Sequence, residues 1–227
     1  MRVKRANIDS LNLSDANMTS LFIANEDYII ETVKSRSVFK PKLWSEAFGQ
    51  SLSRNIIGAD IIHTNLGLEL ALKTYSRTQN KQVLELAGLH SYNQRSKLLM
   101  KHLQGLWSHI QDTKLTRIDI ALDWVEIPSK VLKKLKGNRE PFKWVNSIYF
   151  KTPKEGKRNY YINIIAYDKA KKENLTTPMH RLEFSFSGTF LKDMYLKDLS
   201  KVYEKIEKTI KRIIGITIKI NPIISHA

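Results

Sequence analysis

Cysteine is absent from the 227 residues of this chain. That absence excludes disulfide frameworks and thiolate zinc sites. It also means that cysteine usage does not indicate whether the protein resides in an oxidising or a reducing compartment. Long apolar runs are also absent, since no run approaches the roughly 20 apolar residues needed to span a bilayer. The start of the chain lacks the apolar segment of a signal peptide. We therefore expect a cytoplasmic protein without a membrane partner.

Acidic residues are scarce relative to basic ones. Lys and Arg number 38 against 22 Asp and Glu, which gives a formal net charge of +16. A surface of strong positive potential attracts polyanions, and nucleic acid is the expected partner. The alternative is a charge excess that only aids solubility. With 42% hydrophobic residues, the chain can bury a sizeable core in one domain or two closely packed lobes.

Apolar periodicity predicts a mixture of strands and helices. Short alternating or apolar runs after Gly58 predict a hairpin or meander, and the three- and four-residue spacing of apolar residues over 91–111 predicts a helix. Further strands are predicted over 116–127, from Ser147, from Tyr160 and from His180, with a short helix before Gly137, a helix over 191–214 and an edge strand over 216–224. The fold class is therefore α+β, a mostly antiparallel central sheet of two related half-units with flanking helices.

The same patterns divide the chain into three ranges. Residues 1–57 form a mixed segment without a recognisable catalytic constellation, residues 58–190 form the catalytic region, and residues 191–227 add a helix and the edge strand. No linker rich in Pro, Gly or Ser separates them, so we expect one compact unit.

The run TRIDIALDW carries the first candidate site. In a strand, Arg117, Asp119 and Asp123 share one face while apolar residues occupy the other. Carboxylates this close are best stabilised by a divalent cation. The alternative is an ordinary amphipathic strand with its polar face in water.

The run HRLEFSF repeats this pattern, with Arg181 and Glu183 on one face. If the two strands are neighbours in one sheet, Asp119, Asp123 and Glu183 could form an all-oxygen site for Mg²⁺ or Mn²⁺. His180 could assist, although a histidine at a strand start is more often a surface residue.

The run YYINIIAYDK would place Tyr167 and Lys169 on the same face of a third strand. A nearby cation or metal favours the phenolate, which can attack a phosphodiester. The alternative is a strand-favouring aromatic residue whose hydroxyl reaches solvent.

The order of these motifs resembles a known family. VLELAGLHSYNQ, a helical span, TRIDIALDW, YF, INIIAYDK and HRLEFSF follow one another over roughly residues 80–190. This order resembles the rolling-circle replication initiators of the pT181 plasmid type and, more distantly, filamentous-phage gene II nickases and related relaxases. The six histidines are scattered, with no His-hydrophobe-His pair, so a carboxylate site would replace the histidine site of the commoner nickase superfamily.

The resemblance implies a protein that binds a replication origin, cuts one DNA strand through a tyrosine and remains attached to the 5′ phosphate. It implies Tyr167 as the nucleophile, with Tyr149, Tyr160 or Tyr161 as alternatives. Asp119, Asp123 and Glu183 become the metal ligands, and Arg117, Lys169 and Arg181 become cations beside the phosphate. The implied partners are an origin hairpin, a single-stranded nick site, and a host helicase and polymerase; a homodimer is also compatible.

Three other functions fit the same residues. One is a DNA-binding regulator without catalytic activity, which would ignore metal ions. Another is an RNA-binding module in which Tyr149, Phe150, Tyr160 and Tyr161 stack on bases. The third is a metal-dependent nuclease that uses water and leaves no covalent adduct.

Overall fold

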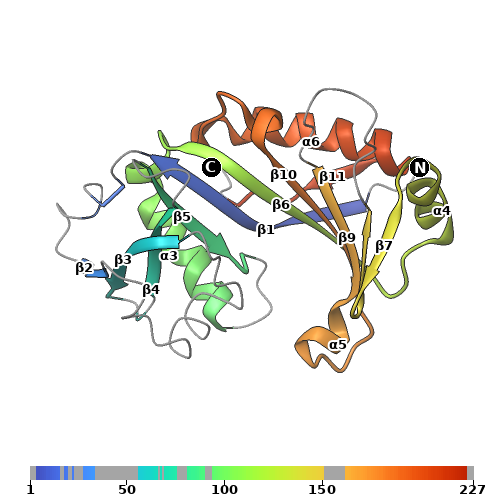
Figure 1. Ribbon diagram of the computed structural model, residues 1–227, viewed down its shortest axis with the longest axis horizontal. Helices are drawn as coiled ribbons and strands as arrows, with labels where there is room; N and C mark the ends of the chain where they lie inside the picture. The colour runs from blue at the N-terminus through green and yellow to red at the C-terminus, as the bar shows by residue number, and fades with distance from the viewer. Residues whose placement is uncertain are drawn as a thin grey trace. The chain divides into compact units, whose positions relative to one another are not determined.

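Figure 1 shows the computed structural model of the chain. It describes residues 4–15, 18–19, 22, 28–33, 56–65, 67, 69–75, 81–89, 94–150 and 162–223. The chain divides into two compact units. Unit 1 comprises Met1–Ser10, Thr116–Met194 and Asp198–Ala227, and unit 2 comprises Leu11–Leu115 and Tyr195–Lys197.

Unit 1 is built on a sheet with the strand order β1-β6-β10-β9-β8-β7. These strands are β1 (Lys4–Asp15), β6 (Lys114–Trp124), β10 (His180–Ser187), β9 (Ile162–Asp168), β8 (Ser147–Phe150) and β7 (Pro141–Trp144). The pairs from β6 to β7 are antiparallel. A short strand, β11 (Ile218–Ile220), pairs with β1 in parallel, so the predicted edge strand is confirmed.

One face of this sheet is the core of unit 1. Ile118, Ile120 and Leu122 alternate along β6 and are fully buried, as are Leu182 and Phe184 on β10. Alternation of this kind places every second side chain on the same face. The other residues of these strands therefore face the opposite side, which carries the polar motifs.

Helix α6 (Leu199–Ile214) supplies a matching apolar stripe. Val202, Ile206 and Ile210 recur every four residues and are fully buried. The helix ends where Gly215 adopts φ +74° and its N–H donates to the carbonyl of Lys211 at 2.8 Å. Helix α4 (Ser129–Asn138) packs against α6.

Arg139, which follows α4, holds two strand ends together. Its Nη1 donates to the carbonyl oxygens of Phe150 at 3.3 Å and Ile162 at 3.0 Å. These residues are the last of β8 and the first of β9. One side chain therefore fixes both ends of the segment that connects the two strands.

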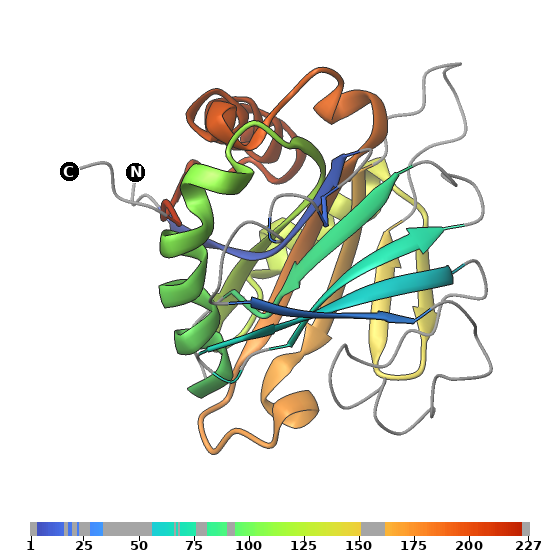
Figure 2. The ribbon, with the colours of Figure 1, turned by 90° about the vertical axis from the view of Figure 1, so that its left-hand side faces the viewer.

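Unit 2 is an antiparallel meander with a helix. Its strands are β2 (Tyr28–Val33), β3 (Ile56–Thr64), β4 (Glu69–Tyr75) and β5 (Gln82–Ala87), with β1 next in the order. Consecutive strands from β2 to β5 pair antiparallel. Helix α3 (Gln94–Ile110) buries Leu99, Leu103, Leu106 and Ile110. The predicted meander and helix are both confirmed (Figure 2).

The antiparallel α+β class is confirmed, whereas two related half-units are not seen among the described residues. The predicted ranges 1–57, 58–190 and 191–227 follow chain order and stay a prediction. The helix predicted from Leu191 begins only at Leu199, because two 3-10 turns (Gly188–Leu191 and Leu196–Asp198) and a positive φ of 59° at Asp193 precede it. No described helix is long and apolar enough to cross a membrane.

Candidate active site

Three sequence motifs meet on the polar face of the unit 1 sheet. In the strand register, Arg181 of β10 lies directly opposite Asp123 of β6 on one side and Tyr167 of β9 on the other. Directly paired residues project to the same face. The prediction that the strands carrying Asp119 and Glu183 are neighbours is therefore confirmed.

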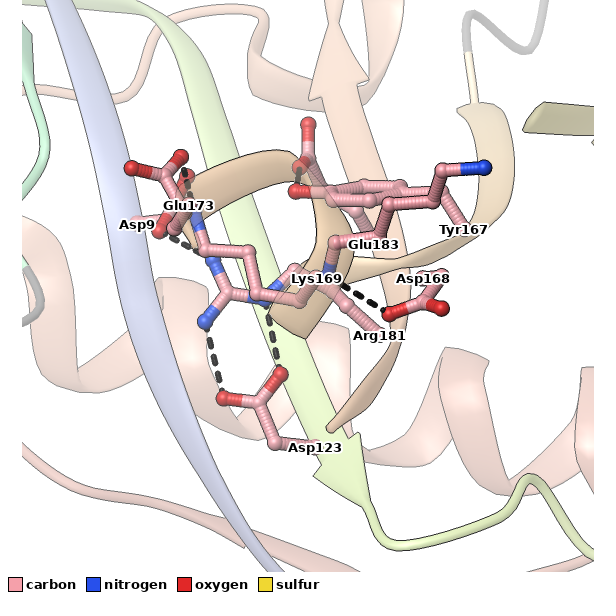
Figure 3. A network of polar contacts seen from close by, with 9 residues as sticks. Asp9, Asp123, Tyr167, Asp168, Lys169, Glu173, Arg181 and Glu183 are labelled. Atoms are coloured by element: carbon pink, nitrogen blue, oxygen red, sulfur yellow. Dashed lines mark hydrogen bonds and ion pairs between the residues drawn. The ribbon is translucent and has the colours of Figure 1, made fainter. Parts of the chain in front are cut away.

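Arg181 is the centre of a buried ion-pair cluster (Figure 3). Its Nε and Nη2 donate to the two carboxylate oxygens of Asp123 at 2.7 and 2.8 Å, and its Nη1 donates to Asp9 at 2.6 Å. The Arg181 side chain is 0% exposed. Burial lowers its pKa, and the carboxylate of Asp9 opposes that shift. The guanidinium thus binds two carboxylates, while its predicted role beside a phosphate stays a prediction.

Asp123 carries a strongly perturbed carboxyl group. Burial and the neighbouring carboxylate of Asp9 raise its pKa from 3.8 to about 6, against the opposing effects of Lys169 and Lys4. Lys4 also donates to the backbone carbonyl of Asp123 and lies 4.9 Å from the centroid of the Trp124 ring. Both Asp123 oxygens are held by Arg181, so a cation could bind this carboxylate only by displacing the guanidinium.

Asp119 is held by a separate group of polar residues. Arg117 Nε donates to its Oδ1 at 2.9 Å, and the hydroxyls of Ser10 and Ser185 donate to the same carboxylate. Arg117 Nη2 also donates to Ser185 Oγ at 3.0 Å. The Arg117 side chain is 46% exposed, so it can reach a ligand in solvent as the sequence predicted for a phosphate-side cation.

Tyr167 and Glu183 form the pair best suited to nucleophilic attack with transfer of a proton. The Tyr167 hydroxyl donates to Glu183 Oε2 at 3.1 Å, and the Tyr167 side chain is buried. Burial and the Glu183 carboxylate raise the pKa of the phenol above its usual range. Burial, then the carboxylates of Asp119 and Asp9, raise the pKa of Glu183. The phenol therefore donates to a carboxyl group whose basicity is increased.

The expected pairing of Tyr167 with Lys169 on one strand face is wrong. Strand β9 ends at Asp168, and Lys169 begins helix α5 (Lys169–Glu173). Asp168 caps this helix, because its side chain accepts from the backbone N–H of Lys171 at 2.9 Å. Alternation stops there, and Lys169 Nζ binds Glu173 at 2.9 Å. The cation beside the Tyr167 ring is Lys172, whose Nζ lies 5.0 Å from the ring centroid.

The donor chemistry of two carboxylates fits a divalent cation. Within the described ranges, no three His, Asp or Glu side chains are grouped as a metal cluster. Glu183, however, lies opposite the small Ala121 and its pKa responds to the charge of Asp119. Mg²⁺ is commonly bound by one or two carboxylates together with substrate phosphates. Asp119 and Glu183 are the residues that could hold it, once the cation replaces hydrogen bonds that both Asp119 oxygens accept from other side chains.

Strand β1 contributes residues that sequence reasoning missed. Asp9 binds Arg181 and Ser10 binds Asp119, although they are consecutive in the chain. The buried apolar residues of β1 are even-numbered at Ala6 and Ile8 but odd-numbered at Leu11 and Leu13. This change of phase is typical of a bulge, which turns two successive side chains to one face. The apolar spacing in the sequence carried that signal.

The remaining candidates lie at the margins of the site or outside it. Tyr149 is half-buried on β8, Phe150 is 1% exposed, and His180 is half-buried at the start of β10. Tyr160 and Tyr161 lie outside the described residues. Tyr167 is therefore the tyrosine that the described strands bring to the carboxylates.

Comparison with known proteins gives structural similarity without a sequence match. No protein-family model matches the sequence, and no curated protein matches it. Among solved structures, the fold is similar to that of a rolling-circle replication initiator protein from Geobacillus stearothermophilus. The TM-score is 0.44 and the sequence identity is 14%, over 92% of this chain and 85% of that chain.

Proposed function

We propose that this protein binds DNA at a replication origin and nicks and rejoins one strand through a covalent 5′-phosphotyrosine. In this role it initiates rolling-circle replication of a plasmid or phage. The observation that carries the proposal is the hydrogen bond from Tyr167 to Glu183, on the sheet face where the three motif strands meet. The net charge of +16 supports DNA as the partner.

In the proposed reaction, the Tyr167 oxygen attacks the scissile phosphorus and the phenolic proton passes to Glu183. The bond from phosphorus to the 3′ oxygen breaks, and that oxygen leaves as a 3′ hydroxyl after taking up a proton. Burial and nearby carboxylates raise the pKa of Glu183, which makes it a better general base near neutral pH. The reverse reaction rejoins the strand without a nucleotide cofactor.

Asp119 and Glu183 would hold the cation, Mg²⁺ or Mn²⁺. When bound, this cation supplies positive charge that stabilises the phosphate in the transition state. One oxygen of Glu183 accepts from Tyr167, which leaves the second available for the cation. Arg117, with an exposed side chain, can contact a neighbouring phosphate. Arg181 holds Asp9 and Asp123 and thereby positions the strand beside Tyr167.

A second candidate function is a DNA-binding regulator without catalytic activity. It is favoured by the burial of Tyr167 and by the complete burial of Arg181 among carboxylates. Such a cluster could serve only to hold three strands together. The protein would then bind DNA with the same salt dependence but would not cut it.

The experiment uses labelled single-stranded oligonucleotides from the origin of the element that encodes the protein. The full chain is incubated with them and Mn²⁺, and the products are separated on a denaturing gel. We expect a protein–DNA adduct that requires the metal and disappears in Tyr167→Phe. Tyr149→Phe is the matched control and should keep the adduct, while Tyr160→Phe and Tyr161→Phe test the two tyrosines that directly precede β9 in the chain.

Each contrary outcome identifies a rival function. Cleavage without an adduct would mean that water is the nucleophile. Binding without cleavage of any origin oligonucleotide would establish the regulator instead. Loss of the adduct in Tyr149→Phe but not in Tyr167→Phe would move the nucleophile to β8.

A further inference from the structure

The edge hairpin of unit 1 exposes aromatic side chains. Phe142 and Trp144, on β7, are 47% and 64% exposed, and Val145 at the turn is 75% exposed. Single exposed apolar residues are common on protein surfaces, whereas contiguous ones mark contact sites. These three lie within four residues of chain, which makes the hairpin the densest such cluster among the described residues.

The two exposed rings lie close to a third ring, that of the half-buried Tyr149. Phe142 and Trp144 are two residues apart on β7 and share a face. Tyr149 lies directly opposite Phe142 on β8. The Tyr149 ring centroid is 6.5 Å from that of Phe142 and 6.4 Å from that of Trp144. We call Phe142, Trp144 and Tyr149 the aromatic platform.

The platform lies on the same sheet face as the candidate active site. Trp144 pairs with Ser147, which pairs with Tyr167, which in turn pairs with Arg181. Side chains of directly paired residues project to one face. Strands are about 4.8 Å apart, so the backbone at Trp144 is about 10 Å from that at Tyr167.

The charge of this part of the sequence favours a polyanion as the occupant, as does the net charge of +16. Residues 129–150 contain six basic side chains and one acidic side chain; these are Lys130, Lys133, Lys134, Lys136, Arg139 and Lys143 against Glu140. Aromatic rings among cations are the usual site for unpaired nucleic-acid strands, because bases stack on rings while cations follow the backbone.

The edge itself is poorly suited to a protein strand. Pro141 has no N–H to donate, and Lys143 places a charge on the exposed strand β7. Proline and lysine on an edge are typical devices that prevent the addition of another strand. The side chains of this hairpin, not its free backbone groups, are therefore the binding elements.

We propose that the aromatic platform stacks on unpaired bases of a single-stranded DNA segment that runs past Tyr167. The identity of the strand rests on the proposed function, in which the DNA must be single-stranded at the cut. The platform would hold the bases next to the scissile phosphate and so set its position relative to Tyr167.

The test is binding of a dye-labelled oligothymidylate of about 12 nucleotides, within the range of single-strand sites, measured by fluorescence anisotropy. We expect Trp144→Ala to weaken binding by about 5-fold to 100-fold, the effect of one lost base stack. Val125→Ala is the matched control, because Val125 is 71% exposed and lies outside the platform. An abasic strand of equal length should bind the wild type as weakly as the normal strand binds Trp144→Ala.

Salt dependence separates stacking from charge. Trp144→Ala should leave the slope of log affinity against log salt concentration unchanged, because the substitution removes no charge. Equal affinities of Trp144→Ala and Val125→Ala would overturn the proposal, as would tight binding of the abasic strand. Stronger binding of the matching RNA would assign the platform to RNA, and a change only in oligomeric state would assign it to a second copy.

Failure of this proposal and failure of the proposed function are distinguishable. Tyr167→Phe should abolish the adduct but keep oligonucleotide binding. An unchanged adduct and unchanged binding in Trp144→Ala would remove the platform and keep the nicking function. Loss of binding in Trp144→Ala without any nicking by the wild type would keep the platform and remove the nicking function.

Discussion

The two ends of the polar sheet face of unit 1 differ in how far their side chains are buried. At the inner end, Arg181 is 0% exposed and binds two carboxylates. At the outer end, Trp144 is 64% exposed, and its ring lies beside that of Tyr149. A buried charge must be paired, because desolvation without a partner costs several kcal/mol. An exposed ring carries no such constraint, so the inner end can be held rigid while the outer end stays available to a ligand.

The largest expected effect comes from breaking the inner cluster. Arg181→Met leaves Asp9 and Asp123 without their shared cation, and removal of one partner of a buried ion pair costs about 3–5 kcal/mol. Urea unfolding should show this loss in the free energy of unfolding. Trp144→Ala, at the outer end, should change it by no more than about 0.5 kcal/mol.

The matched control for this prediction is Arg117→Met. Arg117 also binds an aspartate, but its side chain is 46% exposed, and exposed ion pairs contribute about 0–1 kcal/mol. If Arg181→Met and Arg117→Met cost the same, the distinction between a closed inner end and an open outer end is not real.

The next effect is on the pH dependence of stability. The pKa of Asp123 is raised from 3.8 to about 6, so the folded state binds this proton more tightly than the unfolded state. The stability that the group contributes is present below pH 3.8 and is lost as pH rises through about 6. Between these values, the free energy of unfolding of the wild type should therefore fall with pH relative to that of Asp123→Asn.

Urea titrations at several pH values across that window measure this difference in slope. Trp144→Ala should follow the wild type, because the tryptophan side chain does not titrate. Parallel slopes for the wild type and Asp123→Asn would contradict the perturbed carboxyl group.

The smallest effect should be a gain in stability at the outer end. Val145, at the hairpin turn, has φ 52°, which a β-branched residue adopts only with strain. Val145→Gly should stabilise the protein by about 0.5–1 kcal/mol, since the relief of strain exceeds the entropy cost of glycine. Asn174→Gly is the control: Asn174 also has φ 52°, but asparagine tolerates this region, so its gain should be smaller.

Sequence could predict the strands of the site better than their register. Ile118, Ile120 and Leu122 gave β6 its two faces, and the same alternation gave β10 its faces, because each strand buries one side. The pairing of Arg181 with Asp123 depends on register across a long chain interval, which alternation within a strand does not encode. The sequence therefore did not predict that Arg181 binds both oxygens of Asp123, and the role of Asp123 as a metal ligand stays a prediction.

The structure differs from the sequence prediction at Lys169 and at strand β7, and each difference has a local cause. Lys169 was assigned by alternation, but the side chain of Asp168 caps a helix and ends the strand one residue earlier. An aspartate before a lysine-rich run is a helix-start signal that could have been recognised. Strand β7 was missed because all four of its residues are exposed, so no apolar alternation marks it.

The hydrogen bonds of Arg139 indicate where the chain can accept an insertion. These two hydrogen bonds join the carbonyls of Phe150 and Ile162, so contacts outside residues 151–161 hold the ends of β8 and β9 together. The entropy cost of lengthening a closed loop grows slowly with its length. Insertions between residues 150 and 162 should therefore be tolerated, and this position offers a place for an affinity tag or a fluorescent reporter.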